Sequence, residues 1–234
     1  MKISKIKLLL FFAMHTLFFS CKDQENQFAP AGAINIVNTV IGGGNLKMEH
    51  NETDSVVVNG FKRFLIEPGL KNLKLYPTNN SSISYFKQQV DIKAGVWYSL
   101  YLTGIASGDV EAVFLKENFK ENADSVISLR LINLSPNVEP INVTLTTSPT
   151  LNEFTNVAYK SVSEFKSFPA LRNANINMFQ FQFRSASTNA VLATYNLTAS
   201  NLSLTRFRSA TLVLKGLQGG IGSQALSVIF VPSY

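Results

Sequence analysis

INVTLT at residues 141–146 and MFQFQFR at residues 178–184 are the stretches that decide the fold. In the first, every second residue is apolar and the residues between them are Asn or Thr. In the second, three phenylalanines alternate with Gln and Arg. A period of two places successive side chains on opposite faces of a strand, so that one face lies on a core and the other in water. The pattern therefore predicts half-buried β-strands.

The same alternation continues through most of the chain. In WYSLYLTG, Tyr98, Leu100 and Leu102 share one face, which leaves Trp97 and Tyr101 on the other. EAVFLK, ATLVLKG and ALSVIFV are richer in apolar residues, which predicts strands nearer the centre of a sheet.

Clusters of Gly, Asn, Ser and Pro separate the predicted strands. They are IGGGN at 41–45, PTNNSS at 77–82, GIASGD at 104–109 and QGGIGS at 218–223. Only residues 117–124 and 163–168 are expected to hold a short helical turn. Many short strands with turns between them predict an all-β sandwich or barrel.

The chain also repeats itself in three pairs of segments that keep a constant order. The pairs are INIVN at 34–38 with LRLIN at 129–133, PGLKN at 68–72 with PALRN at 169–173, and YLTG at 101–104 with VLKG at 213–216. This recurrence predicts two tandem antiparallel β-sandwich domains, residues 33–121 and 122–234, joined within the charged stretch KENFKENADS at 116–125. The alternative is one sandwich of about 200 residues in which similar strands recur by chance.

The opening segment, MKISKIKLLLFFAMHTLFFSC, has the order of a secretory signal peptide. Three lysines precede an apolar run, and the small residue Ser20 stands before Cys21, the only cysteine of the chain. We expect residues 1–20 to be a signal peptide that resembles those of bacterial lipoproteins, and residues 21–32 to be a lipidated Cys21 and its tether. An ordinary signal peptide with an incidental cysteine is the alternative. A retained membrane helix would need about 20 apolar residues.

Composition limits the class of protein further. The chain has 21 basic and 15 acidic residues, a formal net charge of +6; three of the lysines and no acid precede Cys21, so cleavage lowers the charge to +3. No basic run remains, which argues against a nucleic-acid partner. Stability must come from apolar burial, because a single cysteine forms no disulfide within the chain.

The residues needed for catalysis or metal binding are scarce. His50 is the only histidine after Cys21, and metal sites and Ser-His or Cys-His machinery need several converging groups. The acidic residues between 49 and 54 and between 109 and 111 lie in or beside predicted turns, where carboxylates are usually solvated. We therefore predict no enzymatic activity, no catalytic residues, no metal site and no cofactor.

The remaining candidates are aromatic. If Tyr98 and its neighbours on the same face lie on the core, Trp97 and Tyr101 face outward, and Tyr85 is expected beside them. A flat surface of Trp and Tyr stacks well on sugar rings, which makes these three residues candidate ligand-binding residues. The alternative is that Trp97 and Tyr101 pack under a loop or against the neighbouring domain.

LRLINLSPN at 129–137, followed by Pro140 and the strand INVTL, resembles the opening of the domain of unknown function 4397 family. KAGVWYSLYLTG at 93–104 is similar to a later strand of that family, which an Ala-Gly turn precedes. The resemblance covers residues 33–234 as two copies and implies immunoglobulin-like β-sandwiches on secreted and lipid-anchored bacterial proteins, with no general enzymatic role. The sequence departs from the family at Asn142, where Asp is usual, and the first copy has IGGGN in place of the Ser-Pro step.

Two further patterns resemble those of Bacteroidetes envelope proteins. KDQENQ, directly after Cys21, is similar to the tract that directs lipoproteins to the outer face of the outer membrane; the alternative is a solvated tether. Asp54-Ser55-Val56 and Asp124-Ser125-Val126 resemble O-glycosylation sites, which makes Ser55 and Ser125 candidate modified residues.

The sequence as a whole predicts a lipid-anchored protein of the outer membrane that is exposed at the cell surface. Its expected role is non-catalytic: binding, adhesion or a structural part of an envelope assembly, with the membrane as one partner and a glycan or envelope protein as another. Glycan capture for a polysaccharide-uptake system is the alternative. A hydrolase is the third possibility, and it would require a cleft with converging acids.

Overall fold

A computed structural model describes residues 30–119, 121–123, 125–170 and 179–233. These residues are almost entirely β, with sixteen strands in four sheets of four strands each. Cys21, the predicted signal peptide and most of the predicted tether lie outside the described residues.

The first eight strands belong to one sandwich, which we call the first sandwich. They are β1 (Gly32–Asn38), β2 (Leu46–Met48), β3 (Asn51–Val56), β4 (Gly60–Ile66), β5 (Gly69–Pro77), β6 (Phe86–Ile92), β7 (Trp97–Gly104) and β8 (Val110–Lys116).

The last eight strands form the second sandwich. They are β9 (Val126–Asn133), β10 (Ile141–Leu145), β11 (Ser148–Val157), β12 (Lys166–Pro169), β13 (Gln180–Ser185), β14 (Val191–Asn196), β15 (Ser209–Lys215) and β16 (Ser227–Pro232). This sandwich also contains the helix α2 (Ala199–Thr205) and a 3-10 turn, η3 (Gly222–Gln224). The expected helical turn at residues 163–168 is wrong, because Lys166–Pro169 pairs with β9 as a strand.

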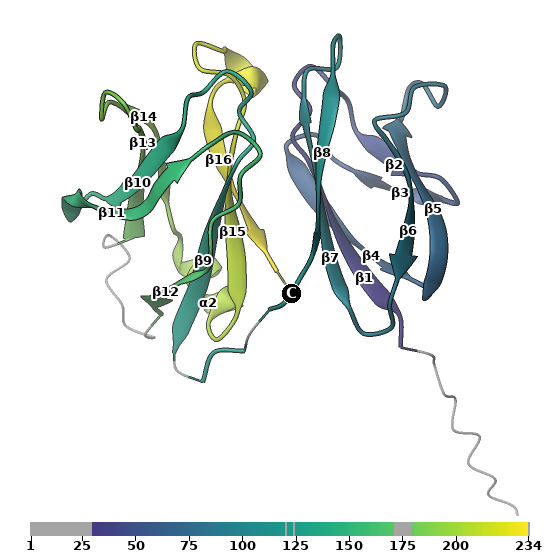
Figure 1. Cartoon of the computed structure of the whole chain (residues 1–234), viewed down its shortest axis with the longest axis horizontal. Coiled ribbons are helices and arrows are strands. Elements are labelled where there is room, and N and C mark those ends of the chain that lie inside the picture. The colour runs from purple at the N-terminus through teal and green to yellow at the C-terminus, as the bar shows by residue number, and fades with distance from the viewer. Residues whose placement is uncertain (1–29, 120, 124, 171–178, 234) are drawn as a thin grey trace, which may run out of the picture.

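The two sandwiches have the same topology. In the first, the sheet β4-β1-β7-β8 packs on the sheet β3-β2-β5-β6. In the second, the sheet β12-β9-β15-β16 packs on the sheet β11-β10-β13-β14. Each strand of the second sandwich is therefore numbered eight higher than its equivalent in the first. The pairs β1–β7 and β9–β15 are parallel and the other pairs between these strands are antiparallel. The two layers are those of an immunoglobulin-like sandwich, although the strand order differs from the seven-stranded ABED/CFG order. Figure 1 shows the two sandwiches side by side.

Strand register aligns the two copies residue by residue. Asn35 of β1 lies opposite Ser99 of β7, and Arg130 of β9 lies opposite Thr211 of β15. INIVN and LRLIN therefore occupy equivalent positions, as do YLTG and VLKG. Both copies also end their first strand on an asparagine whose Oδ1 accepts a hydrogen bond from the backbone two residues on, from Val40 N in the first copy and Ser135 N in the second.

Each sandwich has its own core, and period-two alternation explains it. The core of the first contains Ile34 and Ile36 of β1 and Leu100 of β7, whereas that of the second contains Phe181 and Phe183 of β13. The core-facing positions predicted for INVTL, QFQF and WYSLYLTG are confirmed, because these two clusters contain Ile141, Val143, Phe181, Phe183, Tyr98, Leu100 and Leu102.

A third apolar cluster lies between the sandwiches. It is formed by the outward faces of the sheets β4-β1-β7-β8 and β12-β9-β15-β16, which lie face to face in Figure 1. This contact explains why EAVFLK and ALSVIFV are apolar. The prediction that they form central strands is wrong, since β8 and β16 are edge strands whose outward faces pack against the other sandwich.

Candidate functional site

The interface between the sandwiches is built from equivalent positions of the two copies. Its apolar members include the equivalent pairs Val37 and Ile132, Tyr101 and Val213, Val113 and Ile229, and Leu115 and Val231. Because the same patch of each copy contributes to one contact, the two sandwiches are related by an approximate two-fold arrangement, as in a symmetric dimer.

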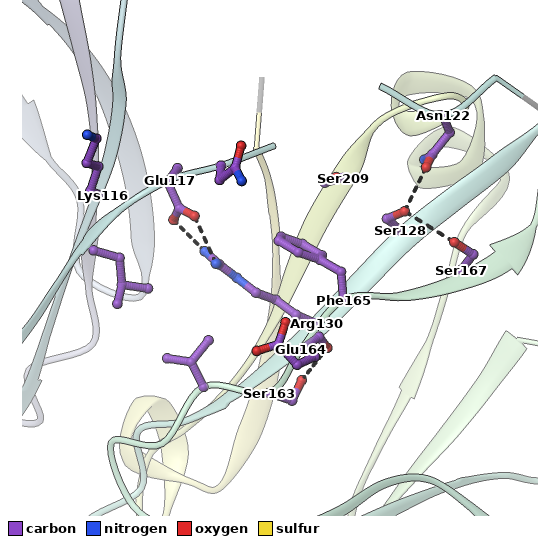
Figure 2. A pocket seen from close by; sticks show the side chains of 13 residues that line it. Lys116, Glu117, Asn122, Ser128, Arg130, Ser163, Glu164, Phe165, Ser167 and Ser209 are labelled. Carbon is purple, nitrogen blue, oxygen red and sulfur yellow. Dashed lines mark hydrogen bonds and ion pairs between the residues drawn. The ribbon is translucent and has the colours of Figure 1, made fainter. Parts of the chain in front are cut away.

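The interface has two equivalent halves, and the half in which β8 and the segment after it contact the second sandwich near β9 contains a buried ion pair. Arg130 on β9 donates from Nη1 to Glu117 Oε2 at 2.9 Å and from Nη2 to Oε1 at 2.5 Å, in the two-pronged geometry that Figure 2 shows. The side chains are 7% and 2% exposed. Arg130 also donates from Nε to Thr211 Oγ1 at 3.0 Å and from Nη2 to the Tyr101 hydroxyl at 3.2 Å.

The electrostatics of Arg130 reflect these contacts. Burial alone would lower the pKa of the guanidinium, but Tyr101 and Glu117 hold that pKa above its usual value. Removing one member of a buried pair leaves the other charge uncompensated, which typically costs about 3–5 kcal/mol. The pair therefore fixes the orientation of one sandwich relative to the other.

A second polar contact lies along the same half. Glu111 of β8 accepts hydrogen bonds from the Tyr159 hydroxyl at 2.6 Å and from Lys160 Nζ at 2.5 Å, both from the second sandwich. These bonds hold the pKa of the Glu111 carboxyl below its usual value. Burial, together with the hydrogen bond to Glu111, raises the pKa of Tyr159 to about 12.

The other half of the interface is neutral at the equivalent positions. Asn35 is the counterpart of Arg130, and the register along β8 and β16 makes Ser233 the counterpart of Glu117. Ser233 O accepts a hydrogen bond from Arg63 Nη2 at 3.2 Å, and Asn59 Nδ2 donates to Ser223 O at 3.2 Å. Asn35 is 3% exposed, and its Oδ1 has no hydrogen-bond partner in the part of the chain that the structure describes.

A row of aromatic rings connects the two halves across the joining segment. Arg63 lies over the Trp97 ring at 4.7 Å, and Arg130 lies over the Phe165 ring at 4.8 Å. Phe119 stands between these rings, with its centroid 6.4 Å from that of Trp97 and 6.2 Å from that of Phe165. The charged stretch predicted as the domain boundary therefore contributes Phe119, which packs between Trp97 and Phe165, and Glu117 of the buried ion pair.

A cleft of about 540 Å³ opens beside the ion pair. It lies between the joining segment and β9, β12 and β15, and Figure 2 shows Glu117, Arg130, Phe165 and Ser209 around it. Ser128 Oγ donates to Asn122 Oδ1 at 3.0 Å and lies 3.5 Å from Ser167 Oγ. The lining is rich in hydroxyl and amide groups, which suits a polar ligand.

The structure does not bring the three candidate aromatic residues together. Tyr101 is 1% exposed and packs against the second sandwich, so its assignment to an exposed stacking surface is wrong. Trp97 does share the outward face with Tyr101, as predicted, but it is half-buried between Arg63 and Phe119. Tyr85 packs against the core of the first sandwich, away from both.

The other candidates lie apart from the cleft or are already hydrogen-bonded. Ser55 is half-buried on the edge strand β3, and Ser125 Oγ donates to Ala170 O at 2.9 Å. Asp54 pairs with Lys62, and Glu49 pairs with Lys74 at 3.3 Å.

Within the described ranges, no group of three or more His, Cys, Asp or Glu residues comes together to hold a metal ion, and no helix is long and apolar enough to span a membrane.

Sequence reasoning missed Arg130 and Glu117. Arg130 is a charged residue in the middle of the apolar strand LRLIN, which was an available sign of an unusual environment. Glu117 gave no such sign, because it stands among other charged residues in KENFKENADS.

Comparisons with known proteins give little further information. No family model matches the chain, and no curated protein does. Similar solved structures include the C-terminal domain of AlgF from P. aeruginosa, which is 20% identical with a TM-score of 0.30 over 37% of this chain and 98% of that domain. That likeness is too weak to inform function.

Proposed function

We propose that the protein is a lipid-anchored module of the bacterial outer membrane, exposed at the cell surface, that binds a partner or supports an envelope assembly without catalysing a reaction. The observation that carries the proposal is the buried contact between the sandwiches. An ion pair, a third apolar cluster and the Glu111 contact make one body of two domains. A rigid body presents its surfaces in fixed positions, which reduces the entropy lost on binding.

The proposed anchor sets how far this body reaches. The described structure begins its first strand at Gly32, about eleven residues after Cys21. An extended chain of that length spans at most about 40 Å. The two sandwiches would therefore stay close to the membrane surface, and several acyl chains on Cys21 would bury tens of methylenes at roughly 0.8 kcal/mol each.

The family resemblance supports the same role. Two copies of one sandwich, as the domain of unknown function 4397 resemblance implies, fit the repeated topology of the sixteen strands. The interface uses one sheet of each sandwich, so the sheets β3-β2-β5-β6 and β11-β10-β13-β14 keep their outward faces available to a partner.

The lipid anchor is tested by metabolic labelling of the native host with an alkyne-bearing palmitate analogue, followed by membrane fractionation. The wild-type protein should be labelled and sediment with the outer membrane, whereas Cys21→Ser should be unlabelled and lose its membrane association. Ser20→Ala is the matched control, because it keeps a small residue before the cysteine and should be labelled normally. Unlabelled wild-type protein, or a Cys21→Ser variant that remains in the membrane fraction, would contradict the proposal.

A further inference from the structure

The cleft marks the place where the two halves of the interface differ in side-chain size. Strand pairing aligns Ser167, Ser128 and Ser209 as one row across β12, β9 and β15. The equivalent row of the first sandwich, across β4, β1 and β7, is Leu65, Ala33 and Trp97. Trp97 occupies its half of the interface, whereas three serines leave space in the other half. The cleft is therefore a property of these positions rather than of the shared fold.

Several polar groups of the cleft have unused hydrogen-bonding capacity. Ser209 is 1% exposed and lines the cleft. The side chains of Asn118, Lys116 and Glu164, also in the lining, have no hydrogen bond or ion pair with described residues. A ligand with several hydroxyl groups can use the free donors and acceptors of these side chains.

The charged residues of the cleft favour neither an anion nor a cation. Lys116 and Arg130 balance Glu117 and Glu164, so its charged residues sum to zero. Arg130, the buried cation, already donates three of its hydrogen bonds to Glu117 and Thr211. An anion would find no net positive field, and the side chain of Phe165 adds an apolar wall.

We propose that this cleft binds a short neutral saccharide, with the row Ser167, Ser128 and Ser209 and the amide of Asn118 hydrogen-bonding to its hydroxyl groups. The proposal deepens the binding role proposed above and depends on it. A volume of about 540 Å³ lies within the range of ligand pockets, which favour domain interfaces. Phe165 packs against an apolar C–H face of the sugar. The ion pair of Arg130 holds β9, which carries Ser128 of the serine row, in a fixed position.

The test is saturation-transfer NMR on the full chain in detergent with maltotriose, cellotriose, mannotriose and chitotriose, each at millimolar concentration. At least one trisaccharide should bind the wild-type protein. Ser167→Trp places a large ring at the exposed rim of the cleft and should weaken that binding at least tenfold. Leu65→Trp is the matched control, since Leu65 is the equivalent exposed residue in the other half, and it should bind as the wild type does.

A second variant avoids any effect of added bulk. Ser209→Ala removes one hydroxyl of the serine row without adding bulk, and it should weaken binding severalfold while the circular dichroism spectrum stays unchanged. The absence of binding by all four trisaccharides would overturn the proposal, as would full binding by both Ser167→Trp and Ser209→Ala. Such a failure would leave the lipid-anchor test unaffected, because labelling at Cys21 does not involve the cleft.

Discussion

The two halves of the interface have the same strand order and register but different side chains at equivalent positions. One half joins Arg130 to Glu117 and Lys160 to Glu111, whereas the other has Asn35 at the position of Arg130. Asn59 stands at the position of Lys160, since Asn59 N donates to Asn38 O and Lys160 N to the equivalent Asn133 O. The acids come from the first sandwich and their cations from the second. Two copies of the second sandwich would bury Arg130 opposite Ser233, which leaves a charge unpaired. The asymmetry therefore favours pairing of unlike copies and disfavours pairing of like ones.

The largest difference between the halves should appear on truncation of the equivalent residues. Arg130→Ala leaves Glu117 buried without its partner and should lower the free energy of unfolding by about 3–5 kcal/mol. Asn35→Ala removes a side chain with an unpaired oxygen and should cost less than about 1 kcal/mol. Urea unfolding followed by the fluorescence of Trp97, the single tryptophan, measures both. Equal losses would show that the ion pair contributes nothing specific.

Features that the copies share should respond alike. Gly104 and Gly216 are equivalent, with φ of 94° and 88°, and a Cβ on either would lie 2.2 or 2.3 Å from a backbone carbonyl oxygen. Gly104→Ala and Gly216→Ala should each destabilise by about 1–3 kcal/mol, because both force a strained backbone. Urea midpoints of the two variants should agree closely, and a large loss in one with none in the other would contradict the equivalence.

The half of the interface that contains Asn35 offers a stabilising substitution. Asn35→Val removes a buried oxygen that lacks a partner among the described residues, and should raise the free energy of unfolding by about 1 kcal/mol. Asn152→Val on the exposed face of β11 is the control, and should change it by less than about 0.5 kcal/mol. A destabilised Asn35→Val would mean that the amide has a required partner.

The smallest effect concerns Glu111, whose contact is partly exposed and screened by solvent. Its pKa in the folded protein lies below the usual 4.5, so its contribution to stability is present above that pH and is lost as the pH falls through the lowered value. Glu111→Gln should therefore unfold at a lower urea concentration than the wild type at pH 7 and at a similar one at pH 2. A constant difference at both pH values would exclude this titration.

Much of the fold could be predicted because period-two alternation indicates which residues share a face of a strand. It assigned Tyr98, Leu100 and Leu102 to one side and Trp97 and Tyr101 to the other, and the structure agrees. Alternation does not state what covers the outward face. Tyr101 looks like an exposed aromatic residue until the second sandwich is placed against it, and β8 looks central because both of its faces are apolar and partly buried.

The cleft could not be predicted for a related reason. Its three serines are far apart in the sequence and become neighbours only through the register of β12, β9 and β15. The internal repeat did contain the necessary alignment, since LRLIN and INIVN place Arg130 and Asn35 at equivalent positions. A comparison of the side chains at aligned positions of the two copies could have located the half of the interface that contains Arg130 and the cleft.

Arg130 and Glu117 bind the two sandwiches into one body through their buried ion pair. A double-mutant cycle tests it directly, with Arg130→Ala, Glu117→Ala and the double variant compared by urea unfolding. Because either single substitution already breaks the pair, we expect the double variant to lose about as much stability as one single variant, with a coupling free energy of about 3 kcal/mol. Losses that add, with a coupling below about 0.5 kcal/mol, would contradict the account.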